Sequence, residues 1–479
     1  MKIAMIASEV TPLAKTGGLA DVIGTLTAAL ERLGREICVI VPAYRSVLQG
    51  EFPVRDTGIR LSAPVADHAV EATILEAILG KGVPVYLVRA DQYFDREFLY
   101  GPTDGDYPDN AERFVFFSRA ALEFLRHQPV DLVHCHDWQT ALAVVYLKTQ
   151  PARYAEIDAT KTVFTIHNLG FQGIFPPSAW SLLNLEPHYF TPQSLEFYGN
   201  VNFLKGAVLC ANKITTVSPS YAQEIMGAEQ GFGLEGVLQQ RAADLVGILN
   251  GVDYYRWNPW TDPFLAHHYG EHSLVVKRDC KKALQLTVGL PDESDTPLIA
   301  MISRLTSQKG FDLVESSFDA LVERGVQFAV LGTGEPRIEQ FLRAAAQRYP
   351  KQVAVEIGFN EALAHQIEAG ADLFLMPSLY EPCGLNQMYS LKYGTIPIVR
   401  AIGGLKDTVE DYNAESQSGT GFVFSPYDSA AMIAAIDRSL LVYRDKQAWT
   451  ALRQRAMGAD FSWDRSAKLY SNLYEQLLQ

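Results

Sequence analysis

The stretch SLYEPCGLNQ, residues 378–387, brings a carboxylate, a proline, a thiol and a glycine together directly after an apolar run. That run, Asp372 to Met376, predicts a buried strand, and the amphipathic segment that follows the loop predicts a helix. Gly384 would let a ligand approach the start of this helix, whose N–H groups and partial positive charge suit a phosphate. Because Glu381 would repel a phosphate, we expect it to face an electron-poor part of the same ligand. A sugar nucleotide has both parts, whereas the alternative is an ordinary loop before an ordinary helix.

A second loop places cations after an apolar run. SRLTSQKG follows a predicted strand from Pro297 to Ser303 and carries Arg304 and Lys309. The chain has a formal net charge of -14, so this pair would be a local cationic site for the charges of a diphosphate. The alternative is a solvated basic loop.

The third loop follows the first predicted strand, Lys2 to Ala7. It holds Lys15, Gly17 and Gly18 immediately before a predicted helix, with Asp21 in the first turn. The loop is neither a Walker A sequence nor a GxGxxG fingerprint. Its place at the carboxyl end of a first parallel strand favours a ligand contact, and a glycine-rich connection with a surface lysine is the alternative.

Two histidine-containing clusters follow the middle strands, HCHDWQ at residues 134–139 and TIHNL at residues 165–169. His134 and His136 lie two apart on a predicted strand, so their side chains share a face while that of Cys135 points away. No second set of ligands stands at metal-site spacing, and we therefore expect a polar site for a sugar or an acceptor in preference to a metal site.

The elements that must position these loops alternate between short apolar strands and helices. Strands are predicted at residues 36–41, 83–88, 131–135, 161–166, 214–217 and 245–249, and again at 297–303, 326–331, 353–357, 373–376 and 396–399. Helices are predicted between them, and two β-like runs between residues 58 and 79 suggest a hairpin at one sheet edge. The alternation predicts parallel sheets with helices on both faces, in two doubly wound α/β domains.

The domains are separated by an irregular stretch. Residues 253–269 are aromatic and proline-containing without periodicity, which predicts a linker between domains. We place the first domain at residues 1–250, the second at 251–460, and a C-terminal helix that crosses back to the first domain at 461–479.

Length, charge and cysteine usage bound the class of protein. With 479 residues, 48% of them hydrophobic, the chain is long enough for more than one core. The acidic charge is spread along the chain, which argues against nucleic acid or an anionic membrane as a partner. The five cysteines lack CxxC spacing and mostly lie in apolar runs, as reduced thiols of a cytoplasmic protein do. We find neither a signal peptide nor a run of eighteen apolar residues, so no membrane association is expected.

Taken together, KTGGLADV, HDWQ, TIHNLGFQG, ILNGVD, SRLTSQKG and PSLYEPCGLNQ closely resemble the bacterial glycogen synthase and plant starch synthase family. The resemblance extends from residue 3 to beyond residue 420. It implies the GT-B glycosyltransferase fold of two Rossmann-like domains with an interdomain cleft. It also implies transfer of glucose from ADP-glucose to the non-reducing end of an α-1,4-glucan, with retention of configuration and without a metal or other cofactor.

The resemblance also assigns roles to residues. It implies catalytic roles for Glu381, His167, Arg304, Lys309 and Asp137. It implies that the substrates contact Lys15, Gly17, Gly18, Asp21, Asn250, Cys383, Gly384 and Leu385. Among these, Arg304 and Lys309 would clamp the pyrophosphate, and Asp137 and Asp21 would lie on the acceptor side. Such a division suits the chemistry, because breaking a glycosyl phosphate builds positive charge at the sugar and negative charge on the diphosphate.

Two positions depart from the family pattern. Asn386 stands where the family usually has threonine after EPCGL, and Ile402 stands before the second GGL where threonine is common. Two other functions stay open at this point. One is a retaining transferase that uses UDP-glucose and a small acceptor, and the other is a non-catalytic glucan-binding relative, which would be expected to have lost Arg304, Lys309 or Glu381.

Overall fold

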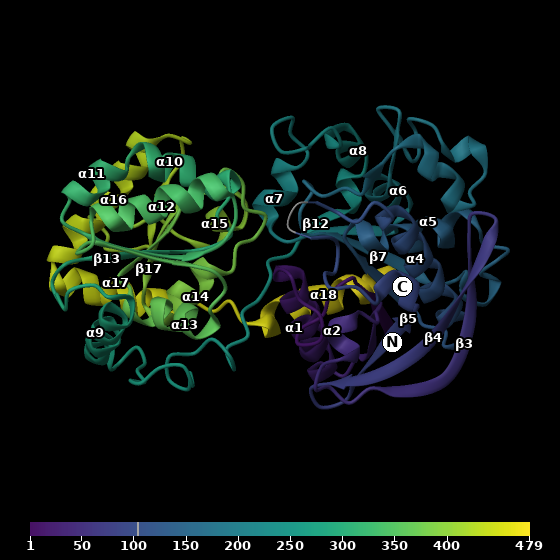
Figure 1. Ribbon diagram of the computed structural model, residues 1–479, viewed down its shortest axis with the longest axis horizontal. Helices are drawn as coiled ribbons and strands as arrows, with labels where there is room; N and C mark the ends of the chain where they lie inside the picture. Colours follow the sequence, from purple (N-terminus) through teal and green to yellow (C-terminus); the bar gives the residue numbers. More distant parts are fainter. Residues whose placement is uncertain (103–104) are drawn as a thin grey trace. The chain divides into compact units, whose positions relative to one another are not determined.

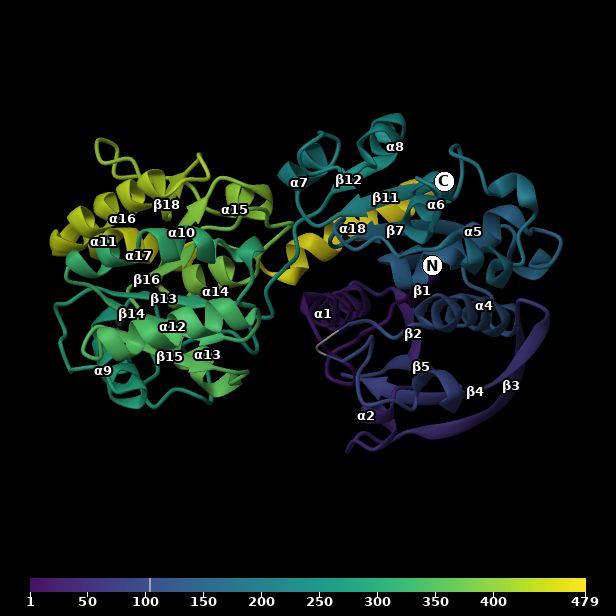
Figure 2. The same cartoon turned by 45° about the horizontal axis from the view of Figure 1, so that its top comes forward.

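A computed structural model describes residues 1–102 and 105–479, and these residues fold as two compact units. Unit 1 comprises Met1–Gly251 with Trp463–Gln479, and unit 2 comprises Val252–Ser462. The sequence places the corresponding boundaries at residues 250 and 460. Both units are doubly wound α/β folds, which confirms the predicted fold class (Figures 1 and 2).

The large sheet of unit 1 has the order β12-β11-β7-β6-β1-β2-β5-β4-β3. Its strands are β1 Lys2–Ile6, β2 Glu36–Pro42, β3 Arg55–Val65, β4 His68–Leu79, β5 Val83–Arg89, β6 Leu132–His136, β7 Lys161–Ile166, β11 Lys213–Thr216 and β12 Leu245–Gly247. The central strands are parallel and apolar because helices cover both of their faces. The predicted edge hairpin is confirmed, since β4 pairs antiparallel with both β3 and β5.

The helices of unit 1 connect these strands. They are α1 Gly18–Arg32, α2 Arg45–Leu48, α3 Asp91–Phe94, α4 Asn110–His127, α5 Ala141–Thr149, α6 Phe203–Cys210, α7 Pro219–Glu224 and α8 Glu235–Gln240. A small antiparallel sheet between β7 and α6, which the sequence did not predict, has the order β8-β10-β9, with β8 Ile174–Phe175, β9 Glu196–Phe197 and β10 Asn200–Asn202.

The C-terminal helix α18, Trp463–Leu478, belongs to unit 1 and lies beside α1 (Figures 1 and 2). Arg32 of α1 donates to Asp464 at 2.8 Å, and Ser466 donates to the carbonyl oxygen of Leu249 at 2.6 Å. Trp463 packs against Gly251, where a Cβ would lie 2.6 Å from the Trp463 backbone and 2.7 Å from its Cγ. The last helix is therefore part of the unit 1 core.

Unit 2 holds a parallel sheet with the order β15-β14-β13-β16-β17-β18. Its strands are β13 Leu298–Ile302, β14 Gln327–Gly332, β15 Val353–Ile357, β16 Leu373–Met376, β17 Ile396–Arg400 and β18 Phe422–Phe424. Its helices are α9 Lys277–Val288, α10 Phe311–Ser316, α11 Phe318–Glu323, α12 Pro336–Arg348, α13 Glu361–Gly370, α14 Asn386–Tyr393, α15 Gly403–Thr408, α16 Ser429–Arg444 and α17 Lys446–Gly458. Figure 1 shows α10, α11, α12 and α16 on one face of this sheet and α9, α13 and α14 on the other.

The predicted linker at residues 253–269 is wrong as a description of that stretch, which is built into unit 2. Trp257 stacks between His365 and Tyr389, with ring centroids 3.8 and 4.0 Å away. Tyr269 is fully buried and donates a hydrogen bond of 2.7 Å to the carbonyl oxygen of Tyr393. The stretch lacks periodicity because it packs through single aromatic side chains and not through one face of a helix or strand.

Strand order identifies the edge of each sheet where a ligand would bind. In unit 1 the chain winds from β1 toward β2 on one side and later from β6 toward β7 on the other, so the winding direction reverses between β1 and β6. In unit 2 it reverses between β13 and β16. Ligands of open α/β sheets bind outside the carboxyl ends of the strands at such switch points.

Candidate active site

The switch point of unit 2 joins the two loops singled out from the sequence. Lys309, from the loop after β13, forms an ion pair of 2.6 Å between Nζ and Oε2 of Glu381, from the loop after β16. Ser378 donates to the same carboxylate oxygen at 3.1 Å. Both charged side chains are largely withdrawn from water. A buried cation next to a buried carboxylate is thus fixed at the carboxyl edge of the sheet.

Glycines let the loops at this edge pack closely. Gly310, in the left-handed region with φ of 79°, lies against the carbonyl oxygen of Pro377, and Gly403, with φ of 46°, lies against that of Glu381. A Cβ at either position would clash with the backbone. The backbone N–H of Gly404 also donates to the carbonyl oxygen of Glu381 at 3.2 Å. These contacts hold the Glu381 loop against the turn after β17.

Helix α14 begins directly beyond this loop. Leu385 is its N-cap residue and makes no side-chain capping hydrogen bond, Cys383 is buried, and Gly384 has φ of 72°. The amide Nδ2 of Asn386 donates to the carbonyl oxygen of Ile302 at 2.6 Å, which ties the start of α14 to the end of β13. Asn386, a departure from the family pattern, therefore has a structural partner at the switch point. An uncapped helix start suits an anion.

Arg304 lies on the exposed side of the same loop as Lys309. It donates a hydrogen bond of 3.3 Å to the side chain of Gln308, and the side chain of Gln308 in turn donates to the carbonyl oxygen of Tyr380, also at 3.3 Å. Gln308 thus holds the guanidinium at the edge of the sheet. Among the interactions of the described residues, this guanidinium has no carboxylate partner. Ile402, the other departure, is a buried core residue that packs with Leu405.

The switch point of unit 1 has a different chemistry. Asp137 follows β6 in the left-handed region, with φ of 56°, and its Oδ1 accepts a hydrogen bond of 2.8 Å from the backbone N–H of His167. Burial raises the pKa of the Asp137 carboxyl to about 7, and the negative charge of Glu9 adds to the rise, while the N–H groups of His167 and Asn168 oppose it. Asp137 and His167 are therefore brought together, as neighbouring strands require.

The histidines beside Asp137 are held neutral. His136 and His167 share a hydrogen bond of 3.0 Å between Nδ1 and Nε2, and burial lowers the pKa of His167 to about 3. The His134 and His136 rings lie on the same strand face with centroids 4.0 Å apart, as predicted. Burial also lowers the pKa of His134 to about 3 and that of His136 well below its ordinary value. Neutral imidazoles can donate to or accept from sugar hydroxyls without adding charge.

The glycine loop after β1 is organised by a carboxylate that the sequence did not single out. Glu9 is buried and accepts hydrogen bonds from the backbone N–H groups of Thr16 at 2.6 Å and Gly17 at 3.2 Å. Lys15 is more exposed and forms an ion pair of 2.7 Å with Asp21. Gly17 is the N-cap of α1 without a side-chain capping bond, and Gly18 opens the helix. The available signal for Glu9 was a carboxylate three residues beyond the end of β1.

Asn250 lies apart from Asp137, beyond β12 at the far end of the strand order. Its side chain is buried, and Oδ1 has no hydrogen-bond partner within residues 1–102 and 105–479. Sequence reasoning also missed Tyr474 of α18, whose hydroxyl bonds to Nδ1 of His134 at 2.8 Å. No local pattern could have revealed that contact, because it joins residues 340 positions apart in the sequence.

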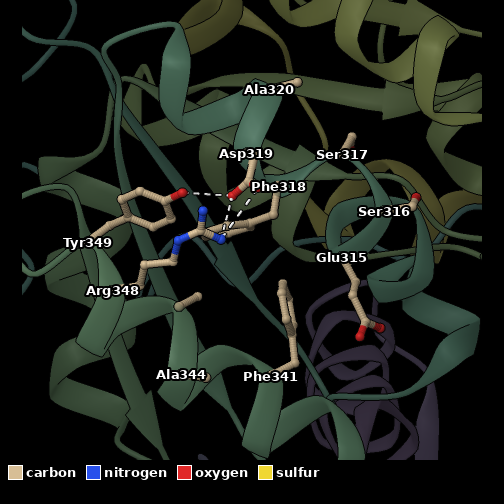
Figure 3. A pocket seen from close by; sticks show the side chains of 11 residues that line it. Glu315, Ser316, Ser317, Phe318, Asp319, Ala320, Phe341, Ala344, Arg348 and Tyr349 are labelled. Carbon is tan, nitrogen blue, oxygen red and sulfur yellow. Dashed lines mark hydrogen bonds and ion pairs between the residues drawn. The ribbon is translucent and has the colours of Figure 1, made fainter.

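Two other features of the described residues bear on the location of the site. In this part of the chain no group of three or more His, Cys, Asp or Glu side chains is placed to hold a metal ion. A cavity of about 300 Å³ opens between α11 and the C-terminal half of α12, where Tyr349 and Arg348 both bond to Asp319 (Figure 3). None of the predicted site residues lines this cavity.

None of the helices that the structure describes is long and apolar enough to cross a membrane. None of the five cysteines, all of them described, forms a disulfide bond.

Comparison with known proteins identifies the family. The starch synthase catalytic domain family matches residues 2–240, and the glycosyl transferases group 1 family matches residues 289–451. The chain is 47% identical to the glycogen synthase of Koribacter versatilis, with 100% of this chain and 99% of that protein covered. It is also 47% identical to the glycogen synthase of Geobacillus thermodenitrificans, with 100% and 98% covered.

Solved structures agree with these relatives. The catalytic domain of starch synthase IV from Arabidopsis thaliana, bound to ADP and acarbose, matches with a TM-score of 0.91 and 35% identity, over 99% of each chain. Sucrose-phosphate synthase from Thermosynechococcus elongatus matches with a TM-score of 0.63 and 18% identity, over 99% of this chain and 98% of that one, which supports the fold alone. The chain therefore belongs to the glycogen synthase and starch synthase family of glycosyltransferases.

Proposed function

We propose that this glycosyltransferase transfers glucose from ADP-glucose to the non-reducing end of an α-1,4-glucan with retention of configuration, and so elongates glycogen. The observation that carries the proposal is the 2.6 Å pair of Lys309 and Glu381 at the switch point of unit 2. A cation beside a carboxylate matches a donor whose diphosphate leaves with negative charge while its sugar becomes electron-poor.

In this proposal Arg304 and Lys309 neutralise the charge that grows on the departing ADP. The start of α14, with Cys383, Gly384 and Leu385, contacts the phosphate and the sugar, and Glu381 lies toward the sugar. The C1–O bond to the diphosphate breaks and its electron pair leaves with ADP. The acceptor 4-hydroxyl forms the new C1–O bond and gives its proton to the phosphate oxygen that leaves with ADP.

Unit 1 would supply the neutral groups of the reaction. His167 would bond to a glucose hydroxyl, Asp137 would lie on the acceptor side with Asp21, and Asn250 would use its unsatisfied Oδ1 for a sugar hydroxyl. Lys15, Gly17 and Gly18 would contact the diphosphate, which requires Lys15 to leave its ion pair with Asp21. We also assign the reaction to the cytoplasm, since free thiols fit a reducing compartment.

The choice of ADP-glucose over UDP-glucose rests on the resemblance to starch synthase IV, whose structure holds ADP at 35% identity. The choice of enzyme over glucan-binding relative is supported by the joint presence of Lys309 and Glu381. A transferase acting on a small acceptor such as fructose has no specific observation in its favour.

The test is an assay of ADP-glucose and UDP-glucose in parallel, with glycogen or fructose as acceptor, followed by linkage analysis of the product. We expect α-1,4-linked glucose on glycogen from ADP-glucose. Transfer to fructose, or from UDP-glucose alone, would contradict the proposal. The assay is repeated in EDTA, where activity should persist because Lys15, Arg304, Lys309 and two helix starts supply the positive charge that a metal would otherwise supply.

A further inference from the structure

The side chain of Gln387, in the first turn of α14, has no role in the proposed function and is fully buried. Its amide Nε2 donates to the carbonyl oxygens of Cys383 at 3.0 Å and Gly384 at 3.1 Å, four and three positions earlier in the chain. One side-chain amide thus ties together two successive carbonyl groups of the loop that follows β16.

The third partner of Gln387 lies on α15. Nε2 also donates to Oγ1 of Thr408 at 3.1 Å, and Thr408 in turn donates to the carbonyl oxygen of Gly404 at 2.6 Å. Gly404 packs directly on the loop, because a Cβ there would lie 2.1 Å from the carbonyl oxygen of Cys383. An amide oxygen in the place of Nε2 would face two carbonyl oxygens, so the orientation of the Gln387 amide is fixed.

This orientation leaves the other end of the amide without a hydrogen bond. Oε1 of Gln387 is buried and has no partner among the residues that the structure describes. It lies against Gly384, where a Cβ would be 2.5 Å from it. A buried oxygen without a partner costs stability, and a methionine of about the same length would fill the space without that cost. Packing alone therefore does not account for a glutamine at this position.

The bonds of Gln387 set the direction of two backbone N–H groups. In a trans peptide unit the N–H points away from the carbonyl oxygen of the preceding residue. Because the carbonyl groups of Cys383 and Gly384 both point at Nε2, the N–H groups of Gly384 and Leu385 point to the opposite side of the loop. Within residues 1–102 and 105–479, neither of these two N–H groups has a hydrogen-bond acceptor.

The backbone conformation of the loop gathers these N–H groups together. Gly384 is left-handed, with φ of 72°, and Leu385 is right-handed, with φ of -119° and ψ of -37°. Successive residues of opposite hand place neighbouring N–H groups around one concavity, which suits an anion. The concavity opens at the start of α14, where the helix dipole adds positive potential.

We propose that Gln387 is a positioning residue for the diphosphate of the sugar nucleotide. It holds two carbonyl groups behind the loop and so aims the N–H groups of Gly384 and Leu385 at the phosphate oxygens. Without Nε2, either peptide unit can turn and present a carbonyl oxygen, which repels a phosphate, in place of the N–H. The inference rests on the proposed function, which supplies the diphosphate.

The experiment titrates ADP and adenosine, separately, into the full chain and measures glucose transfer from ADP-glucose to glycogen. Gln387→Met removes Nε2 and keeps the length of the side chain, and Thr408→Val removes one of its three acceptors. Ser390→Ala is the matched control on the same helix, because the Ser390 hydroxyl donates to the buried carboxylate of Glu368 at 2.7 Å and not to the loop.

We expect Gln387→Met to weaken ADP binding about 10- to 100-fold, the scale of one or two hydrogen bonds to a charged group, and to lower kcat about 10²-fold. Adenosine lacks the diphosphate and should bind as it does to the parent. Thr408→Val should weaken ADP binding about 2- to 5-fold. Gln387→Met and Ser390→Ala should both lower Tm by about 2 to 8 °C, yet Ser390→Ala should keep parental ADP affinity.

Parental ADP affinity in Gln387→Met would overturn the inference. Equal losses of ADP and adenosine, or the same ADP loss in Ser390→Ala, would also overturn it, because they would reduce Gln387 to a support of the fold. If Gln387→Met does not fold, Thr408→Val decides, and parental ADP affinity in that variant overturns the inference.

Direct binding keeps this test separate from the proposed function. If the parent transfers no glucose from ADP-glucose while Gln387→Met loses affinity for ADP and not for adenosine, the role of Gln387 stands and the proposed reaction is wrong. If transfer succeeds and Gln387→Met binds ADP as the parent does, only the role of Gln387 is wrong.

Discussion

The carboxyl edges of the two sheets share one topology and differ in charge. In unit 2 the loops after β13 and β16 meet in the ion pair of Lys309 and Glu381. In unit 1 the loop after β6 presents Asp137, whose pKa burial raises to about 7, beside His167, whose pKa burial lowers to about 3. The same switch point is therefore built with full charges in one unit and with groups at or near neutrality in the other.

This difference suggests a division of work. A departing diphosphate needs cations that interact more strongly as its charge grows, whereas an acceptor hydroxyl needs oriented groups that do not repel an electron-poor sugar. Lys15 of unit 1 is the exception, since it is a cation that forms an ion pair with Asp21 and that the proposed function requires to leave this pair for the diphosphate. Substituting residues of one unit at a time tests this division.

The largest effect is expected from the cations of unit 2. Lys309→Ala and Arg304→Ala should each lower kcat by about 10² to 10⁴, because the proposed charge-assisted contact to the leaving group is lost. Steady-state kinetics with ADP-glucose and glycogen measure this. Lys351→Ala, which removes an exposed lysine from the same unit, serves as the control.

Lys309 needs a second control, since its loss leaves Glu381 buried without its cation, at a cost of about 3 to 5 kcal/mol. The double variant Lys309→Met with Glu381→Leu removes both charges and should recover stability in chemical denaturation while activity stays low. Recovery of activity together with stability would mean that the pair serves the fold alone.

The second largest effect is expected from Glu381→Gln, which keeps the shape of the side chain. Turnover should fall about 10²- to 10³-fold, while affinity for ADP changes little, because ADP lacks the sugar that we propose the carboxylate faces. Calorimetric titration with ADP is compared with kcat. Equal losses in both quantities would move Glu381 from the sugar to the nucleotide or to the structure of the loop.

The third prediction concerns the titration of unit 1. The pKa of Asp137 is raised to about 7, so its ionised fraction grows as pH rises through 7, and kcat/KM should rise over the same range if the carboxylate form acts. Asp137→Asn should remove this acidic limb and lower kcat/KM by about 10- to 100-fold.

Glu9→Gln sharpens this test, because removing the negative charge of Glu9 lowers the pKa of Asp137 and should shift the limb to lower pH. If kcat/KM of Asp137→Asn rises with pH as it does in the parent, a group other than Asp137 titrates.

The smallest effect on activity is expected from Tyr474 of α18, which contacts the buried histidines of unit 1. Tyr474→Phe removes the hydroxyl that bonds to Nδ1 of His134, which should cost about 1 to 3 kcal/mol of unfolding free energy and change kcat less than about tenfold. Thermal unfolding and kinetics check this, with Leu469→Ala on the exposed side of α18 as the control. A large fall in kcat without any loss of stability would contradict this prediction. It would mean that the Tyr474 hydroxyl of α18 affects the reaction through Asp137 and His167.

Much of the fold follows from local sequence, because strands buried on both faces are continuous apolar runs. The predicted bounds of β7, β15 and β16 agree with the structure. The β8-β10-β9 sheet was missed because strands of two or three residues carry no periodicity. The stretch 253–269 was misassigned because its packing depends on rings such as Trp257 that stack on distant partners.

The sequence predicts at which edge of each sheet the candidate site lies, but it does not predict which side chains contact one another there. Sequence places Lys309 and Glu381 after strands whose carboxyl ends meet, but the ion pair joins loops 72 positions apart. The bond between His134 and Tyr474 spans 340 positions, and no local rule selects it. Glu9 was overlooked because its role, holding the N–H groups of Thr16 and Gly17, appears only once the loop has folded back.

The division of work between the two edges is tested most directly by titrating ADP and maltoheptaose, separately, into Arg304→Ala and Asp137→Asn. Arg304→Ala should lose about tenfold or more in ADP affinity and keep its affinity for maltoheptaose. Asp137→Asn should bind ADP as the parent does and bind maltoheptaose more weakly. Equal losses of both ligands in both variants, or the reverse pattern, would contradict the account.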